Sequence, residues 1–365
     1  MVQKNTIRVL IVDDSVMVRK ILSDLLGQDP SIEVVGTASD GAFALHKVKT
    51  LQPDVVTLDV EMPKKSGLEL LPELMAAHPV PVIMVSGVTE KGAKSTIKAL
   101  ELGAVDFVTK PGGGAAQNIQ EIAAELTRKI KAVVKAGAKT RTITRSPFTP
   151  PPRVTLPPLP AGRVRTGGGG TVIGLGASTG GTEALREVLV ALPPQMPPIV
   201  VVQHMPPGFT SAFANRLDGL AALNIKEAQN NDLLEPGKAL IAPGHSHLVI
   251  KQRGNQYVAQ LDQSDPVMRH RPSVDVLFHS LAREVGRNCI AVIMTGMGAD
   301  GARGMSQIRQ TGGKTIAQDE QSCVVFGMPK EAIDLGGAAE ILPLNKIAGR
   351  LVEMVHRGSA QRTTV

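Results

Sequence analysis

Hydrophobic residues fall into short continuous runs, rich in β-branched side chains, that alternate with segments of helical periodicity. The first half has such runs at residues 7–12, 33–38, 54–59, 80–86 and 104–110, and the second half has others at 171–177, 198–204, 238–243, 289–296 and 314–319. Continuous apolar runs are typical of strands buried on both faces, and intervening helices are typical of parallel sheets. The pattern predicts two α/β domains, each a doubly wound parallel sheet.

A segment without periodicity separates the two predicted domains. Residues 117–136 precede it and carry the apolar stripe of an amphipathic helix, which Gly137 is placed to end. The stripe consists of Ile119, Ile122, Leu126, Ile130 and Val133. Seven prolines then fall within residues 146–160, and residues 166–170 read TGGGG, which is typical of a flexible linker. The sequence predicts domains over residues 1–136 and 168–358, joined by a linker over 137–167.

Charge and composition argue against several classes of protein. The formal net charge is +7, but residues 127–166, most of which form the linker, hold ten Lys or Arg and no acidic residue, so the excess belongs to this stretch. A nucleic-acid-binding domain would need a basic recognition helix, and the sequence does not indicate one. No leader sequence or membrane-spanning apolar stretch is evident, so we expect a cytoplasmic protein that does not insert into membranes. Cys289 and Cys323 are too few for a disulfide framework, and we expect two buried, reduced thiols.

Polar side chains follow the predicted strands of the first domain. Asp13 and Asp14 follow the first strand, and Asp59, Ser86 and Lys110 end three later ones. Each alone would be an ordinary cap or turn residue. The carboxyl ends of parallel strands meet at one edge of a sheet, so we expect all five side chains to converge. Clustered carboxylates suit Mg²⁺, and an aspartate beside that ion can accept a phosphoryl group.

This arrangement resembles the receiver domain of two-component response regulators, over residues 7 to about 130, and implies a flavodoxin-like fold. By that resemblance Asp59 is the phosphorylated residue. The implied Mg²⁺ ligands are Asp13, Asp14, Asp59 and the backbone carbonyl of Glu61. Ser86 occupies the place of the switch hydroxyl, Phe107 the place of the aromatic residue coupled to it, and Lys110 offsets the phosphoryl charge.

Residues 173–181 of the second domain read IGLGASTGG, where a predicted strand turns into a helix. A dinucleotide-binding turn would need glycine where Thr179 stands, and no lysine completes a phosphate-binding loop of the Walker type. An NAD-dependent oxidoreductase is therefore the weaker interpretation. The stronger one is an elbow that exposes the hydroxyl of Ser178, with glycines that let the turn bend and leave room for a substrate backbone.

A serine nucleophile needs a base and a carboxylate, and the same sheet edge provides both. The strand at 198–204 ends in His204, and the loop after 289–296 carries Asp300. Together with Ser178 they can form a triad, in which the imidazole takes the hydroxyl proton and the carboxylate orients the ring. Each could instead be a cap, loop or turn residue. A metal site of His204, His245, His247 and Asp300 is a further alternative, but His245 and His247 lack zincin spacing and are expected to be loop residues near the rim.

The segments GASTGG, VVQHMPPGFT, APG with the histidine after it, RPSVDVLF and MTGMGADG resemble the catalytic domain of the CheB-type chemotaxis protein-glutamate methylesterases. The resemblance implies a Rossmann-like esterase domain without a cofactor, with Ser178 as nucleophile, His204 as general base and acid, and Asp300 orienting it. The implied substrates are glutamyl methyl esters of chemoreceptors, with deamidation of receptor glutamines as a second activity.

The same resemblance implies how the enzyme is assisted and controlled. The backbone amide of Met297 faces the oxyanion in the family, and the amide of Thr179, which follows the nucleophile, is a candidate for the second donor. A chemotaxis histidine kinase would supply the phosphoryl group. Phosphorylation of the receiver would then activate the esterase by uncovering Ser178.

Overall fold

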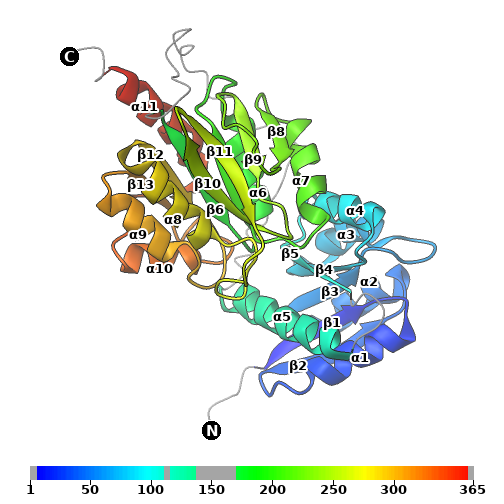
Figure 1. Ribbon diagram of the computed structural model, residues 1–365. Coiled ribbons are helices and arrows are strands. Elements are labelled where there is room, and N and C mark those ends of the chain that lie inside the picture. Colours follow the sequence, from blue (N-terminus) through cyan, green and yellow to red (C-terminus); the bar gives the residue numbers. More distant parts are fainter. Residues whose placement is uncertain (1–5, 111–115, 137–169, 361–365) are drawn as a thin grey trace. The chain divides into compact units, whose positions relative to one another are not determined.

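The computed structural model describes residues 6–110, 116–136 and 170–360. The chain divides into two compact units, Met1–Pro147 and Phe148–Val365, which are described separately (Figure 1). The predicted linker, 137–167, and the predicted capping residue Gly137 lie outside the described residues.

The first unit contains a parallel sheet in the order β2-β1-β3-β4-β5. This is the flavodoxin-like order that the resemblance implied. The strands are β1 (Ile7–Val12), β2 (Ile32–Ala38), β3 (Val55–Asp59), β4 (Val82–Ser86) and β5 (Asp106–Thr109). The helices are α1 (Val16–Leu26), α2 (Gly41–Leu51), α3 (Gly67–Ala77), α4 (Glu90–Glu101) and α5 (Ala116–Lys135).

Buried strands and amphipathic helices account for this unit. Every residue of β3 and β4 is buried, as their continuous apolar runs predicted. On one face, Leu26 of α1 and Leu126 and Ile130 of α5 pack into the same apolar cluster as the strands. The long helix predicted over residues 117–136 is confirmed as α5, Ala116–Lys135. Of its predicted apolar stripe, Leu126, Ile130 and Val133 face the core, because each is at most 1% exposed.

The second unit contains a larger parallel sheet in the order β14-β13-β12-β6-β7-β9-β8. Its strands are β6 (Val172–Ala177), β7 (Ile199–Gln203), β8 (Asn224–Glu227), β9 (Lys238–Ile241), β12 (Cys289–Ile293), β13 (Lys314–Gln318) and β14 (Glu340–Leu342). The helices are α6 (Gly181–Ala191), α7 (Phe209–Asp218), α8 (Val274–Glu284), η1 (Gly286–Asn288), α9 (Ala302–Gln310), α10 (Met328–Asp334) and α11 (Leu344–Ala360). The strand order reverses between β6 and β12, so a ligand site is expected at the carboxyl ends there.

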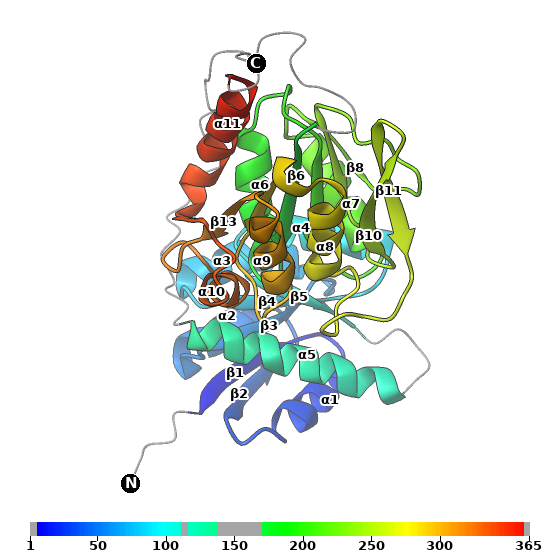
Figure 2. The same cartoon turned by 60° about the vertical axis from the view of Figure 1, so that its left-hand side comes forward.

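The pattern of apolar runs missed part of this unit. β10 (His247–Arg253) and β11 (Gln256–Asp262) form a separate antiparallel hairpin, and the edge strands β8 and β14 were also not predicted. These strands lack a long apolar run, because polar and apolar residues are mixed along the hairpin and the edge strands are short. The hairpin packs against α8 (Figure 2).

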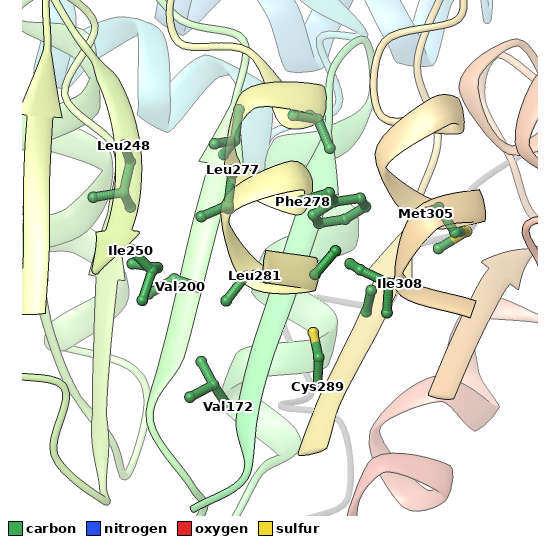
Figure 3. Packing of buried hydrophobic residues seen from close by; sticks show 14 of the residues in the cluster. Val172, Val200, Leu248, Ile250, Leu277, Phe278, Leu281, Cys289, Met305 and Ile308 are labelled. Carbon is green, nitrogen blue, oxygen red and sulfur yellow. The ribbon is translucent and has the colours of Figure 1, made fainter. Parts of the chain in front are cut away.

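Helix α8 lies directly on β6, and the glycines of the strand make this possible. A Cβ atom on Gly174 would lie 2.5 Å from Cδ1 of Leu281, and one on Gly176 would lie 2.4 Å from Cγ1 of Val274. Figure 3 shows Phe278 and Leu281 of α8 among side chains of the sheet, the hairpin and α9. These two glycines therefore serve the packing of a helix, which differs from the role in the turn that the sequence suggested.

We predict that Gly176→Ala destabilises the second unit by about 1–3 kcal/mol, because the added methyl group overpacks the contact with Val274. The matched control is Gly349→Ala in α11, where an added Cβ meets nothing within 4 Å. This control should stabilise by about 0.5–1 kcal/mol, since alanine is the better helix former. Urea unfolding of residues 168–358 measures both changes, and equal stability of Gly176→Ala and the parent would contradict the packing argument.

Candidate functional site

The first unit brings together four of the side chains predicted to converge. The carboxylates of Asp13, Asp14 and Asp59 each place an oxygen within 4.8 Å of the others, a grouping that can hold a metal ion. Lys110 Nζ lies 2.7 Å from Asp59 Oδ2 and 3.0 Å from Asp13 Oδ2. Asp14 is not the cap of α1, because Ser15 caps that helix by accepting a bond from the amide of Val18.

The electrostatics of this cluster are dominated by burial. Asp59 is 1% exposed, and desolvation raises its pKa to about 6, even though the hydrogen bond and charge of Lys110 oppose this. The charge of Asp13 raises the pKa of Asp59 further. Burial also lowers the pKa of Lys110, but Asp59 and Asp13 outweigh it and leave that pKa above its ordinary value. The cluster is short of positive charge, which a hard divalent cation would supply.

The predicted switch residues take defined positions. Ser86 is completely buried, and its Oγ lies 2.8 Å from Oγ1 of Thr96 in α4, which also donates to the carbonyl of Gly92 at 2.7 Å. Its hydroxyl is thus engaged with α4, and no hydrogen bond to a carboxylate of the described residues is present. Phe107 is 4% exposed. The amide of Glu61 donates to Asp59 Oδ1 at 3.1 Å, while the role of its carbonyl stays a prediction.

In the second unit, Ser178 follows β6 in a turn held by backbone bonds. Its amide donates to the carbonyl of Thr295 at 3.0 Å, and its carbonyl accepts from the side-chain amide of Gln203 at 2.9 Å. The N-cap of α6 is Gly180, whose φ of +76° favours glycine, and no side chain caps the helix. Ser178 is therefore not the capping residue, and its hydroxyl is free of that task.

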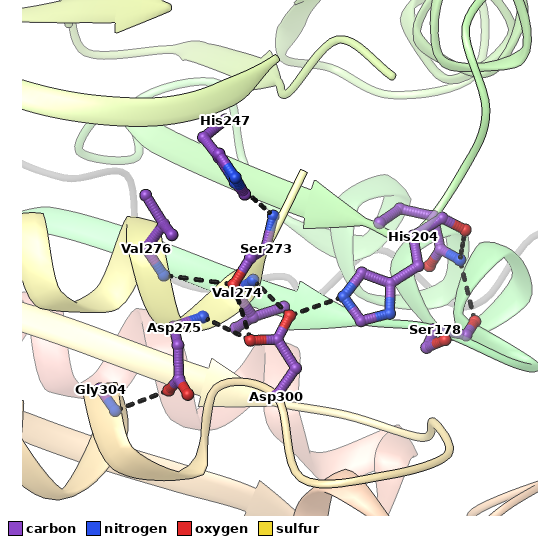
Figure 4. Close-up of polar contacts among 10 residues, drawn as sticks. Ser178, His204, His247, Ser273, Val274, Asp275, Val276, Asp300 and Gly304 are labelled. Carbon is purple, nitrogen blue, oxygen red and sulfur yellow. Dashed lines mark hydrogen bonds and ion pairs between the residues drawn. The ribbon is translucent and has the colours of Figure 1, made fainter. Parts of the chain in front are cut away.

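His204 and Asp300 form a close pair beside this turn. His204 Nε2 lies 2.8 Å from Asp300 Oδ2, and the imidazole is only 7% exposed (Figure 4). The other ring nitrogen, Nδ1, is buried without a hydrogen-bond partner among the described residues, and it lies on the side of the ring that faces Ser178. No hydrogen bond joins the Ser178 hydroxyl to the ring in the described part of the chain.

Asp300, in the loop between β12 and α9, lies against the beginning of α8 and is 1% exposed. Oδ1 accepts from Ser273 Oγ at 2.7 Å and from the Asp275 amide at 2.9 Å, and Oδ2 accepts from the Val274 amide at 2.7 Å. Burial raises the pKa of Asp300, but the hydrogen bond and charge of His204 and the bonds from Asp275 and Ser273 outweigh it and hold the pKa below its ordinary value. Since an ionised carboxylate only accepts, Nε2 of His204 carries the proton and Nδ1 has the free lone pair.

Several residues of this site were not predicted. His270 stacks on His204, with ring centroids 3.8 Å apart and planes 7° from parallel. Gln203 links the carbonyls of Ser178 and His204, at 2.9 and 3.3 Å. Ser273 caps α8 as well as binding Asp300. The sequence signal that could have found them is their position next to residues already singled out. His270 and Ser273 lie beside or in the segment RPSVDVLF, and Gln203 precedes His204.

The alternative metal site of histidines is not assembled. His247 was expected near the rim, but it begins β10 and is completely buried with both nitrogens bonded to backbone groups. His245 is exposed in a turn, as expected. Over the described ranges, the acidic cluster of the first unit is the group of side chains that could hold a metal. Cys289 is buried, whereas Cys323 is partly exposed, and both are free thiols.

Comparison with known proteins gives consistent matches for both units. The CheB methylesterase family matches residues 173–351, and the response regulator receiver domain matches residues 9–123. A protein-glutamate methylesterase/protein-glutamine glutaminase of Pseudomonas aeruginosa is 48% identical over 357 residues, covering 98% of this chain and 99% of the relative. The chain belongs to the CheB methylesterase family.

Further relatives agree with this membership. A protein-glutamate methylesterase/protein-glutamine glutaminase of Methylobacillus flagellatus is 48% identical over 360 residues, covering 99% of this chain and all of the relative. The solved CheB methylesterase catalytic domain of Thermotoga maritima is 44% identical with a TM-score of 0.50, covering 51% of this chain and 99% of that one. Both resemblances and the predicted fold class are thus confirmed. None of the described helices is both long and apolar enough to span a membrane.

The lowered pKa of Asp300 predicts a stability that depends on pH. Its contribution is fully present above the ordinary aspartate pKa of about 3.9 and is lost as the pH falls through the lower pKa of the folded state. We expect the free energy of unfolding of residues 168–358 to fall more steeply between about pH 4 and pH 2 than that of Asp300→Asn. Urea titrations at a series of pH values measure the two slopes, and parallel slopes would exclude this role of Asp300.

Proposed function

We propose that the chain is a phosphorylation-activated serine hydrolase that removes methyl esters from glutamyl side chains of chemoreceptors and deamidates receptor glutamines. The observation that carries the proposal is the pair formed by His204 and the buried, ionised Asp300. The imidazole of His204 turns its free Nδ1 toward Ser178. The printed names of the relatives, which describe both activities, support the choice of substrate.

Ser178, His204 and Asp300 have distinct roles in this reaction. Nδ1 of His204 takes the proton of the Ser178 hydroxyl as its oxygen attacks the ester carbonyl, and the resulting imidazolium gives that proton to the departing methanol. Water then attacks the carbonyl of the acyl-enzyme, with His204 taking a proton from the water and giving one to the departing oxygen of Ser178. This step regenerates the serine and leaves a glutamate side chain on the receptor. Asp300 keeps the proton on Nε2 and stabilises the imidazolium. The hydrogen bonds that Asp300 accepts from the beginning of α8 suit this role, because they keep its carboxylate ionised and fixed.

The developing oxyanion needs preorganised donors. The amide of Met297 is our candidate for one of them, since no described residue accepts a hydrogen bond from it. The amide of Thr179, at the start of the elbow, is the candidate for the second. Thr179 itself is 2% exposed, and its carbonyl accepts a bond from Thr295 Oγ1 at 2.9 Å, which fixes the local backbone.

The first unit would control this reaction by accepting a phosphoryl group on Asp59. Asp13, Asp14 and Asp59, with the carbonyl of Glu61, would hold Mg²⁺, which would neutralise the charge that gathers on the transferred group. Lys110 already pairs with Asp59 and would compensate the same charge. Ser86 would leave Thr96 to bond the phosphoryl oxygens, and Phe107 would repack with it. A chemotaxis histidine kinase is the proposed phosphodonor, and cytoplasmic location follows from it.

We predict that Ser178→Ala lowers methanol release from methylated chemoreceptors by at least about 10³-fold, because it removes the nucleophile. The assay uses membranes that carry receptors with radiolabelled methyl groups, with and without acetyl phosphate. Acetyl phosphate should accelerate the parent protein and leave the variant inactive. Ser306→Ala, at a half-buried serine on α9, is the matched control and should retain the parent rate. A fully active Ser178→Ala would refute the esterase mechanism.

We predict that Asp59→Asn takes up no label from acetyl [³²P]phosphate, since the amide is not a nucleophile toward phosphorus. Asp24, which is exposed on α1, provides the matched control, and Asp24→Asn should be labelled like the parent. Chelation of Mg²⁺ with EDTA should abolish labelling of the parent. Persistent labelling of Asp59→Asn would show that another residue is the acceptor.

A further inference from the structure

His247 is a buried histidine that the proposed reaction does not use. It is completely buried at the start of β10, and both of its ring nitrogens take part in hydrogen bonds. Nδ1 lies 3.1 Å from the amide of Ser273, and Nε2 lies 3.1 Å from the carbonyl of Asp265. Figure 4 shows the ring pointing to Ser273, at the beginning of α8.

The partners of His247 determine where its proton lies. An amide N–H can only donate, so Nδ1 must be the acceptor, and a carbonyl only accepts, so Nε2 must carry the hydrogen. Protonation of Nδ1 would place two donors against each other at a side chain that is completely buried. The imidazole is therefore a neutral connector with one fixed tautomer, which excludes it as the acid, base or metal ligand of the second unit.

One of the two bonds leads to Asp300. The amide that His247 fixes belongs to Ser273, which is the N-cap of α8. Ser273 Oγ and the amides of Val274 and Asp275 supply three hydrogen bonds to the carboxylate of Asp300. A displacement of Ser273 would move these three donors together and would change the orientation of Asp300 relative to His204.

A second hydrogen bond restrains the same helix start. Asp275 is 3% exposed, and its Oδ1 accepts a bond from the amide of Gly304 in the first turn of α9, at 2.7 Å. Asp300 precedes α9 and accepts hydrogen bonds from the start of α8. Asp275 of α8 in turn accepts one from the start of α9, so the two helix starts are held to each other. His247 adds the connection from this pair of helices to the hairpin β10–β11.

The other bond of His247 leads to the ring of His204 by a different route. Asp265, whose carbonyl accepts from Nε2, begins the segment that continues to His270. His270 stacks on His204 at 3.8 Å between ring centroids. His247 therefore anchors both elements that contact the imidazole of His204, the carboxylate through Ser273 and the stacked ring through the segment from Asp265 to His270.

We propose that His247 is a positioning residue of the esterase, a neutral buried connector that holds the beginning of α8 and the segment carrying His270 in register around His204. This inference rests on the proposed function, because it assigns the contacts of the base used there. The role acts on the reacting geometry and leaves substrate binding unaffected, so it is expected in kcat and not in KM.

The experiment compares His247→Leu and His247→Asn in the full chain, treated with acetyl phosphate. Leucine fills the volume and removes both hydrogen bonds, whereas the amide oxygen of asparagine can take the place of Nδ1 and accept from Ser273. We expect His247→Leu to lower kcat for methanol release roughly 10²-fold, as misplaced catalytic groups do, with KM within about twofold. His247→Asn should recover most of the rate. His356→Leu in α11, a helix that supplies no contact of the site, is the control and should retain the parent kcat.

A fluorophosphonate probe provides a second measurement, because it reacts with serines activated by a base and does not depend on the receptor. Its rate of labelling at Ser178 should follow the same order, parent and His247→Asn above His247→Leu, with Ser178→Ala as the blank. A parent-like rate in His247→Leu, or an asparagine variant as slow as the leucine variant, would overturn the proposal. If the parent labels but releases no methanol, the receptor substrate is wrong, and the labelling rates still decide the role of His247.

Discussion

The second unit depends on one carboxylate that is removed from water. A buried carboxylate is unstable unless donors replace its hydration, and Asp300 is 1% exposed. The first turn of α8 provides such donors, because a helix begins with N–H groups that have no acceptor within the helix. Nε2 of His204 supplies a further one from the end of β7. The position of α8, the start of α9 and the orientation of the imidazole are thus consequences of compensating one charge.

Each unit places a carboxylate at the carboxyl edge of its own sheet, but the pKa values of the two carboxylates are shifted in opposite directions. Asp300 has a complete set of donors, and its pKa lies below the ordinary value. Asp59 is equally buried, but its compensation by Lys110 is incomplete, and its pKa is raised to about 6. This contrast fits the proposed roles. A residue that orients an imidazole must stay ionised and fixed, whereas a phosphoryl acceptor needs an environment that a cation and a transferred group can complete.

The sequence was sufficient for the features that depend only on where strands end. Asp59, His204 and Asp300 follow continuous apolar runs, and the carboxyl-end rule then brings them to the predicted edges without knowledge of any contact. It was insufficient where a contact depends on packing between distant segments. His247 follows a PGHS turn and reads as a loop residue, and only the docking of the hairpin on α8 buries it. The bond of Ser86 with Thr96 likewise depends on how α4 lies against β4.

The glycines of IGLGASTGG show why a motif can suggest the wrong chemistry when its spacing alone is considered. Spacing of this kind is used elsewhere to bring backbone amides close to a pyrophosphate. In this chain Gly174 and Gly176 lie within β6, and the space above them is filled by Leu281 and Val274 of α8. Close approach of α8 to β6 brings Val274, whose amide binds Asp300, against the strand that leads to Ser178. The absence of side chains at Gly174 and Gly176 of β6 therefore helps to place the carboxylate of Asp300, which lies in the loop after β12 and is bound by the beginning of α8.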